Sequence, residues 1–244
     1  LYTQSVDDVD TFWLNAAQHI AWDTPPQTAL DRSDAPFYHW YPDGRLNTCF
    51  NAVDRHVLAG RGAQNAIIYD SPITGAKRHI SFAELQRQTA RFAGMLARLG
   101  VQKGDRVIIY MPMIPEAVVA MLGCARLGAV HSVVFGGFAA AELAKRIDDA
   151  TPKVILSASC GHEPGRVVEY KPLLDAAIDQ STHKPDNCVI VQRDSVQAEL
   201  IQGRDLEWHQ AHEVAAEMAP ISLHANDSLY ILYTSGTTGQ PKGV

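Results

Sequence analysis

Residues 106–138, RVIIYMPMIPEAVVAMLGCARLGAVHSVVFGGF, carry the clearest evidence of the fold class. Residues 107–111 form an unbroken apolar run, which is typical of a parallel strand buried on both faces. Residues 115–127 begin with a proline and predict a helix, because proline suits the first helical turn. Residues 129–135 predict a second strand. A strand, helix and strand in this order indicate a unit of a parallel sheet.

The same alternation continues on both sides of this unit. Downstream, the pattern predicts helices at residues 139–149, 172–178 and 205–218, and strands at 154–158, 189–191 and 229–233. Upstream, it predicts short strands at 67–69 and 78–80, then a helix that begins with a capping box at Ser81 and Glu84 and ends at Gly100. We therefore expect an α/β fold in which helices flank a mostly parallel sheet. Residues 1–62 are expected to form an N-terminal helical extension, and residues 63–244 the α/β domain.

Composition narrows the class of protein. Of the 244 residues 46% are hydrophobic, and the net charge is −6. A nucleic-acid-binding protein would usually have a basic excess or a basic stripe, so we expect no nucleic-acid partner. The most apolar stretch is interrupted by Pro112, Glu116 and Arg126, which argues against a membrane span.

The spacing of the cysteines indicates a reducing cellular compartment. No two of the four cysteines have the spacing of a zinc site or a redox motif, so we interpret them as reduced core residues of a cytoplasmic protein. They are Cys49, Cys124, Cys160 and Cys188.

The strongest functional signal is the loop YTSGTTGQPKG at residues 233–243, directly after an apolar segment. Its glycines let backbone N–H groups approach phosphate oxygens, its hydroxyl groups add donors, and its lysine adds one mobile positive charge. The residues expected to hold the phosphates of ATP are Thr234, Ser235, Gly236, Thr237, Thr238, Gly239 and Lys242. Loops rich in Gly, Ser and Thr are also common as plain turns, but a plain turn requires no particular residue order.

The end of the loop excludes an ordinary P-loop. A Walker motif needs Gly-Lys followed by Ser or Thr, whereas Lys242 here lies between Pro241 and Gly243. The loop instead resembles the signature of the adenylate-forming superfamily. Further segments are similar to the acetyl-CoA/propionyl-CoA synthetase branch, and together they cover the whole chain. They are Trp40 with Gly44, Leu46 with Asn47, and residues 51–56, 103–105, 110–116 and 120–138.

The resemblance implies two half-reactions that use ATP, Mg²⁺ and CoA. A short-chain carboxylate attacks the α-phosphate to give an acyl-adenylate and pyrophosphate, and the CoA thiol then displaces AMP. Thr234 and Lys242 are the candidate catalytic residues, because stabilising the leaving pyrophosphate is an electrostatic task. By the same resemblance, Phe135, Gly136, Gly137 and Arg166 contact the nucleotide end of CoA. The alternative for Arg166 is a surface arginine without a ligand.

One position departs from the acetate enzymes. They have a second arginine three residues before the first, where this chain has Glu163, and a carboxylate would repel a phosphate. The loop 161–166 followed by Glu169 and Tyr170 is more similar to propionyl-CoA synthetases, so propionate is the favoured acid. Acetate–CoA ligase is one alternative, and a non-catalytic nucleotide-binding module of the same fold is another.

Two further groups are interpreted without a chemical role. His209, His212 and Glu213 form no complete ligand set and are expected to be solvated surface; Cys160 is expected to be a loop cysteine. The chain begins without methionine and stops just after the loop, which predicts a fragment of a longer protein. The resemblance places the adenine, acyl and magnesium contacts and a C-terminal catalytic lysine downstream of Val244, so residues 1–244 alone are expected to be inactive.

Overall fold

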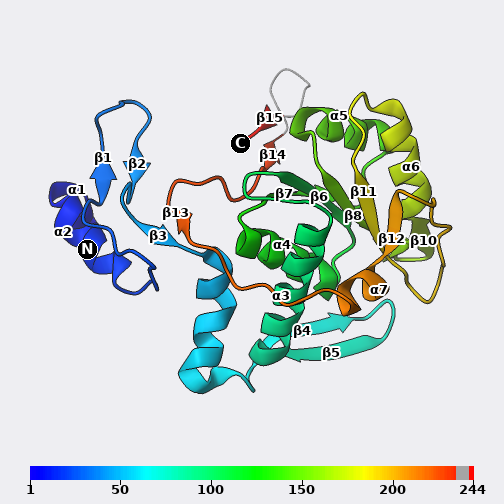
Figure 1. Ribbon diagram of the computed structural model, residues 1–244, viewed down its shortest axis with the longest axis horizontal. Coiled ribbons are helices and arrows are strands. Elements are labelled where there is room, and N and C mark those ends of the chain that lie inside the picture. The colour runs from blue at the N-terminus through cyan, green and yellow to red at the C-terminus, as the bar shows by residue number, and fades with distance from the viewer. Residues whose placement is uncertain (235–241) are drawn as a thin grey trace.

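The computed structural model describes residues 1–234 and 242–244. Its centre is a five-stranded sheet with the order β12-β11-β8-β6-β7, in which every neighbouring pair is parallel (Figure 1). The predicted α/β class is confirmed. The strands are β6 (Arg106–Met111), β7 (Val130–Phe135), β8 (Val154–Ala158), β11 (Asn187–Val191) and β12 (Asp205–Glu207).

Helices cover both faces of this sheet. One face packs against α3 (Phe82–Arg98) and α4 (Pro115–Leu127), beside which lies α7 (Trp208–Glu213). The other packs against α5 (Ala140–Ala150) and α6 (Tyr170–Gln180). Because side chains alternate along a strand, β6 supplies apolar residues to both cores. This is why residues 107–111 are continuously apolar in the sequence.

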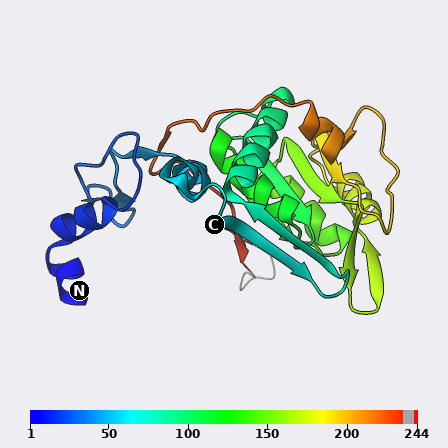
Figure 2. The same ribbon diagram turned by 90° about the horizontal axis from the view of Figure 1, so that it is seen from below.

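The N-terminal extension projects away from the α/β body (Figure 2). It contains two helices, three short strands and a pair of π-helical segments. These are α1 (Tyr2–Asp7), α2 (Val9–Ala17), β1 (Leu30–Asp31), β2 (His39–Trp40), β3 (Arg45–Leu46), η1 (Phe50–Asp54) and η2 (Val57–Arg61). Buried Asn47 fastens it to the body, since its Nδ2 donates to the carbonyls of Ala125, Arg126 and Ile221 at 2.8–3.1 Å.

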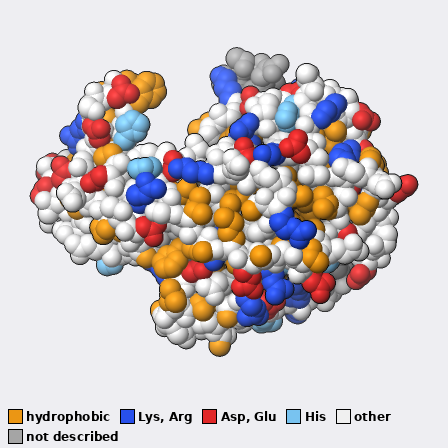
Figure 3. All heavy atoms as spheres, viewed as in Figure 1, with side chains coloured by type: hydrophobic (Ala, Val, Ile, Leu, Met, Phe, Trp, Pro, Cys, Tyr) orange, Lys and Arg blue, Asp and Glu red, His pale blue; other side chains and the backbone are white. Residues whose placement is uncertain are grey.

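Small antiparallel pairs complete the structure. The predicted hairpin is β4 (Asn65–Ser71) with β5 (Ala76–Ser81), and a second is β9 (Cys160–Glu163) with β10 (Arg166–Glu169). Near the chain end β13 (Leu223–His224) pairs with β3, and β14 (Tyr233–Thr234) pairs with β15 (Lys242–Gly243). Acidic and basic side chains are interspersed over the face shown in Figure 3, which agrees with the absence of a basic stripe in the sequence.

Two element predictions were wrong. The expected helix at 205–218 starts as strand β12, because this segment hydrogen-bonds along the edge of β11 before α7 begins. The expected strand at 229–233 makes one parallel bridge to β7, between His131 and Tyr230, and its end pairs with β15 instead. Both outcomes depend on pairing with distant segments, which local patterns do not encode.

Several local features agree only in part with the sequence predictions. The Ser81 hydroxyl accepts from the Glu84 N–H at 3.2 Å, but the Glu84 carboxylate accepts from Gln88, so only half of the capping box forms. The four cysteines are free and buried as predicted, although Cys160 lies in a strand rather than a loop. Within residues 1–234 and 242–244, every helix is too short or too polar to cross a membrane.

Candidate functional site

The site lies at the carboxyl edge of the sheet, where the strand order reverses. From β6 the chain continues to β7 on one side, and β8 follows on the other side of β6. Such a switch point leaves a crevice outside the strand ends, where α/β proteins commonly bind ligands. A cavity of about 350 Å³ opens there. Its wall includes residues 111–114 after β6, residues 133–137 at the end of β7, and residues 69–73 of the β4–β5 hairpin.

The turn Phe135-Gly136-Gly137 forms one side of this cavity. A Cβ atom at Gly136 would lie 2.2 Å from the Tyr170 hydroxyl oxygen, and one at Gly161 would lie 2.7 Å from it. Tyr170 in turn stacks on buried Tyr110 with ring centroids 5.2 Å apart. Glycine is therefore required at position 136 by the close approach of an immobile ring. Phe135 is left 71% exposed at the mouth of the cavity.

Arg166 forms an ion pair with Glu163. Arg166 and Glu163 lie opposite each other in the β9–β10 hairpin. The Glu163 Oε2 accepts from Arg166 Nε at 2.7 Å and lies 2.6 Å from its Nη2. Glu163 lines the cavity, whereas Arg166 is outside its wall and its side chain is 70% exposed. The structure thus brings Phe135, Gly136 and Gly137 to the cavity but does not bring Arg166 into it.

The two ends of the predicted phosphate loop lie side by side. Thr234 pairs with Lys242, and Leu232 and Val244 exchange backbone hydrogen bonds at 2.8 and 2.9 Å. The loop therefore leaves and re-enters a short antiparallel ladder, with the Lys242 side chain exposed. Ser235, Gly236, Thr237, Thr238 and Gly239 lie outside the described residues.

Helix α5 supports the base of this loop. The Tyr233 hydroxyl donates to Asp149 Oδ2 at 2.6 Å, and burial together with this carboxylate raises the pKa of Tyr233. The Arg146 guanidinium lies over the Tyr233 ring at 5.4 Å and over the Phe138 ring at 4.6 Å. Phe138 directly follows the glycine turn. Arg146 thereby contacts both the turn beside the cavity and the start of the phosphate loop.

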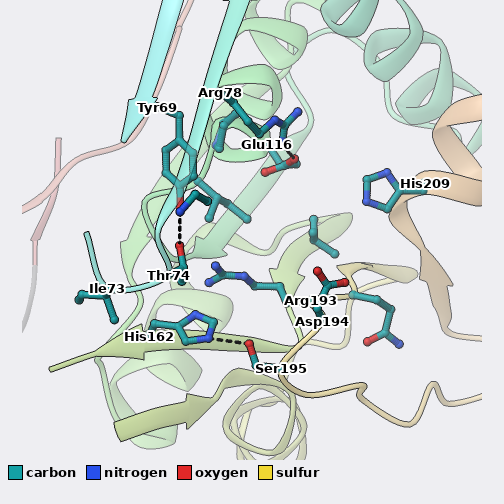
Figure 4. A pocket seen from close by; sticks show the side chains of 15 residues that line it. Tyr69, Ile73, Thr74, Arg78, Glu116, His162, Arg193, Asp194, Ser195 and His209 are labelled. Atoms are coloured by element: carbon teal, nitrogen blue, oxygen red, sulfur yellow. Dashed lines mark hydrogen bonds and ion pairs between the residues drawn. The ribbon is translucent and has the colours of Figure 1, made fainter. Parts of the chain in front are cut away.

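A second cavity of about 540 Å³ adjoins the first (Figure 4). The two share Tyr69, Ile73, Ile114, His162 and Arg193. His162 Nε2 lies 2.6 Å from the Ser195 hydroxyl, and burial followed by the nearby Arg193 charge lowers the pKa of His162. Sequence reasoning missed Arg193. Its position two residues after the strand that ends at Val191, at the edge where the other site residues lie, was the available signal.

The two histidines of α7 differ in exposure, and the expectation that both belong to the solvated surface was wrong for His212, which is half-buried. His212 Nε2 pairs with the Gln88 carbonyl at 2.9 Å, and its ring stacks on Trp208. His209 is exposed and faces the second cavity. No cluster of three or more potential metal-ligating side chains occurs in the part of the chain that the structure describes.

Comparison with known families decides the assignment. Residues 55–244 match the family described as AMP-binding enzyme. The chain belongs to this family. Residues 1–52 match the family described as acetyl-coenzyme A synthetase N-terminus. In this AMP-binding enzyme chain, the α/β body thus follows a segment that is similar to that N-terminal family.

Individual relatives to which the chain is similar include several acyl-CoA synthetases. It is 49% identical to the mitochondrial acyl-CoA synthetase short-chain family member 3 of Rattus norvegicus, 45% to the acetyl-coenzyme A synthetase of Streptomyces avermitilis and 44% to the propionate–CoA ligase of Escherichia coli. Each match covers the whole chain and 36–39% of the relative. The solved acetoacetyl-CoA synthetase from Streptomyces lividans superposes with a TM-score of 0.89 at 28% identity, covering 100% of this chain and 37% of that one.

Proposed function

We propose that this AMP-binding enzyme chain serves an ATP-dependent short-chain acyl-CoA synthetase that converts propionate, ATP and CoA to propionyl-CoA, AMP and pyrophosphate. The observation that carries the proposal is the phosphate-loop sequence at residues 233–243 in a chain whose relatives are acyl-CoA synthetases. Because the chain spans 36–39% of the length of those relatives, the activity is proposed for the protein at full length.

Residues of this chain have separate tasks in the two half-reactions. Thr234 and Lys242 end the phosphate loop, where a hydroxyl and a positive charge would stabilise the triphosphate and the departing pyrophosphate. The antiparallel pairing of these two residues supports this role, because it holds both ends of the loop together. Mg²⁺ would neutralise phosphate charge when bound. The glycine turn 135–137 lines the cavity and offers the exposed Phe135 ring to the nucleotide of CoA.

Propionate is proposed as the preferred acid because of the loop 161–166. Overall identity does not separate the two acids, since the acetate and propionate relatives are 45% and 44% identical to this chain. ATP–pyrophosphate exchange by the full-length protein with each acid tests the preference directly. The proposal predicts a higher kcat/KM with propionate, and a higher value with acetate would replace it with an acetate–CoA ligase.

The competing candidate is a non-catalytic nucleotide-binding module. The intact lysine and glycines of the phosphate loop favour an enzyme over this candidate. Nucleotide binding without pyrophosphate exchange, for all short-chain acids tested, would favour the module. We also propose a cytoplasmic location, which cell fractionation of the host can test against the mitochondrial location in the name of the rat relative.

A further inference from the structure

The ion pair between Arg166 and Glu163 affects whether a phosphate can bind at this part of the site. Arg166 was expected to contact a phosphate, yet two of its nitrogens face a single Glu163 oxygen at 2.6–2.7 Å. A phosphate at this pair would have to displace a carboxylate that also lines the cavity. Like charges repel, so the pair is a poor phosphate site.

Arg193, in contrast to Arg166, has most of its hydrogen-bond donors free within the described chain. It is half-buried, lies two residues after the end of β11 and lines both cavities; Figure 4 shows its side chain among those of the second cavity. Its backbone N–H donates to the Ser159 hydroxyl at 2.9 Å, which fixes the start of the side chain. Within the described chain, its guanidinium makes one hydrogen bond, from Nη1 to the Cys160 carbonyl at 3.3 Å, and no ion pair. Most of its N–H donors are therefore available to a ligand.

The surroundings of Arg193 suit a phosphate. Tyr170 stands against Gly136 and lines the same cavity as Arg193 and Glu163, and the charge of Glu163 is paired with that of Arg166. The glycine turn and Arg193 thus border the same cavity, on which Tyr170 also opens. The other cation of the wall, Arg78, is paired with Glu116 at 3.3 Å. Asp194 lies in the second cavity and is exposed to water, which weakens its repulsion of an anion.

We propose that Arg193, rather than Arg166, binds a phosphate group of CoA when the nucleotide end of CoA lies against the turn 135–137. This inference rests on the proposed function, because it assigns the phosphate contact of the same thioester-forming site. A planar guanidinium with free donors can bind two phosphate oxygens at once. Glu163 then keeps Arg166 neutralised and outside the cavity.

The test uses the full-length protein and separates the two half-reactions. ATP–pyrophosphate exchange with propionate, without CoA, reports adenylation; thioester formation reports the KM for CoA. Arg193→Gln should raise the KM for CoA about ten- to a hundredfold, the scale of lost charged hydrogen bonds, while exchange stays at the wild-type rate. Arg193→Lys should recover part of the loss because it keeps the charge. Arg91→Gln is the matched control, since Arg91 lines neither cavity and its half-exposed side chain pairs with Glu217 at 3.4 Å.

Dephospho-CoA identifies which phosphate is bound. If Arg193 binds the 3′-phosphate, Arg193→Gln should leave the KM for dephospho-CoA unchanged; if it binds the diphosphate, the KM for both acceptors should rise. A KM for CoA within about twofold of wild type in both Arg193 variants, with active enzyme, would overturn the inference. Failure of the proposed function would look different, because the wild-type protein itself would then form neither adenylate nor thioester.

Discussion

Replacing Asp54 with alanine should strongly destabilise the junction between the extension and the α/β body. Asp54 receives two hydrogen bonds from Arg126, at 2.7 and 3.0 Å, and the two side chains are only 6% and 5% exposed. Arg126 also donates to the Met218 carbonyl at 2.6 Å, so the pair connects η1, α4 and the segment before the phosphate loop. Removing one partner leaves a buried charge uncompensated, which costs about 3–5 kcal/mol.

This loss is large compared with the total stability of a domain, about 5–15 kcal/mol. Urea unfolding of the 244-residue chain, followed by circular dichroism, should show a lower midpoint for Asp54→Ala. Asp70→Ala is the control, because Asp70 pairs with Lys77 at 3.0 Å while both side chains are more than half exposed. Its effect should stay below about 1 kcal/mol. The double variant Asp54→Leu, Arg126→Met should be more stable than Asp54→Ala, since it removes both charges together.

The reasoning would be refuted if Asp54→Ala cost no more than Asp70→Ala. That result would mean that, when Asp54 is absent, Arg126 is solvated or sufficiently stabilised by its hydrogen bond to the Met218 carbonyl. A double variant as unstable as Asp54→Ala would instead assign the loss to packing rather than to the unpaired charge.

Three other predictions concern the site and its support. Gly136→Ala should raise the KM for CoA and lower Tm, because the added Cβ would lie 2.2 Å from the Tyr170 hydroxyl; a thermal melt and a CoA titration check it. Lys242→Ala should lower kcat for ATP–pyrophosphate exchange by roughly a hundredfold or more if Lys242 stabilises the departing pyrophosphate, and unchanged exchange would remove it from the mechanism. Burial lowers the pKa of His131 to about 4 from 6.5, so the unfolded chain takes up the proton first as pH falls. The contribution of His131 to the free energy of unfolding is present above pH 6.5 and should fall by about 2 kcal/mol between pH 7 and pH 5. Urea unfolding of His131→Gln should show a smaller decline over the same pH range.

The sequence by itself determined the alternation of strands and helices, the helix at Pro115–Leu127 and the strand at Val154–Ala158 with their observed bounds. Apolar runs, proline positions and turn residues are local signals, and here they agree with the fold. The loop at residues 233–243 is proposed as a phosphate loop from residue order alone, because phosphate binding favours a set of glycines, hydroxyls and one lysine.

Tertiary structure decided which arginine faces the cavity. Arg166 and Glu163 meet because a hairpin places them opposite each other, and Arg193 reaches the same cavity because β11 lies next to β8 in the sheet. Residues 205–207, which have a helical pattern in the sequence, form an edge strand because they pair with β11. These outcomes depend on pairing between segments far apart in the chain. The free energy of such pairing comes from the assembled sheet and not from any local stretch of residues.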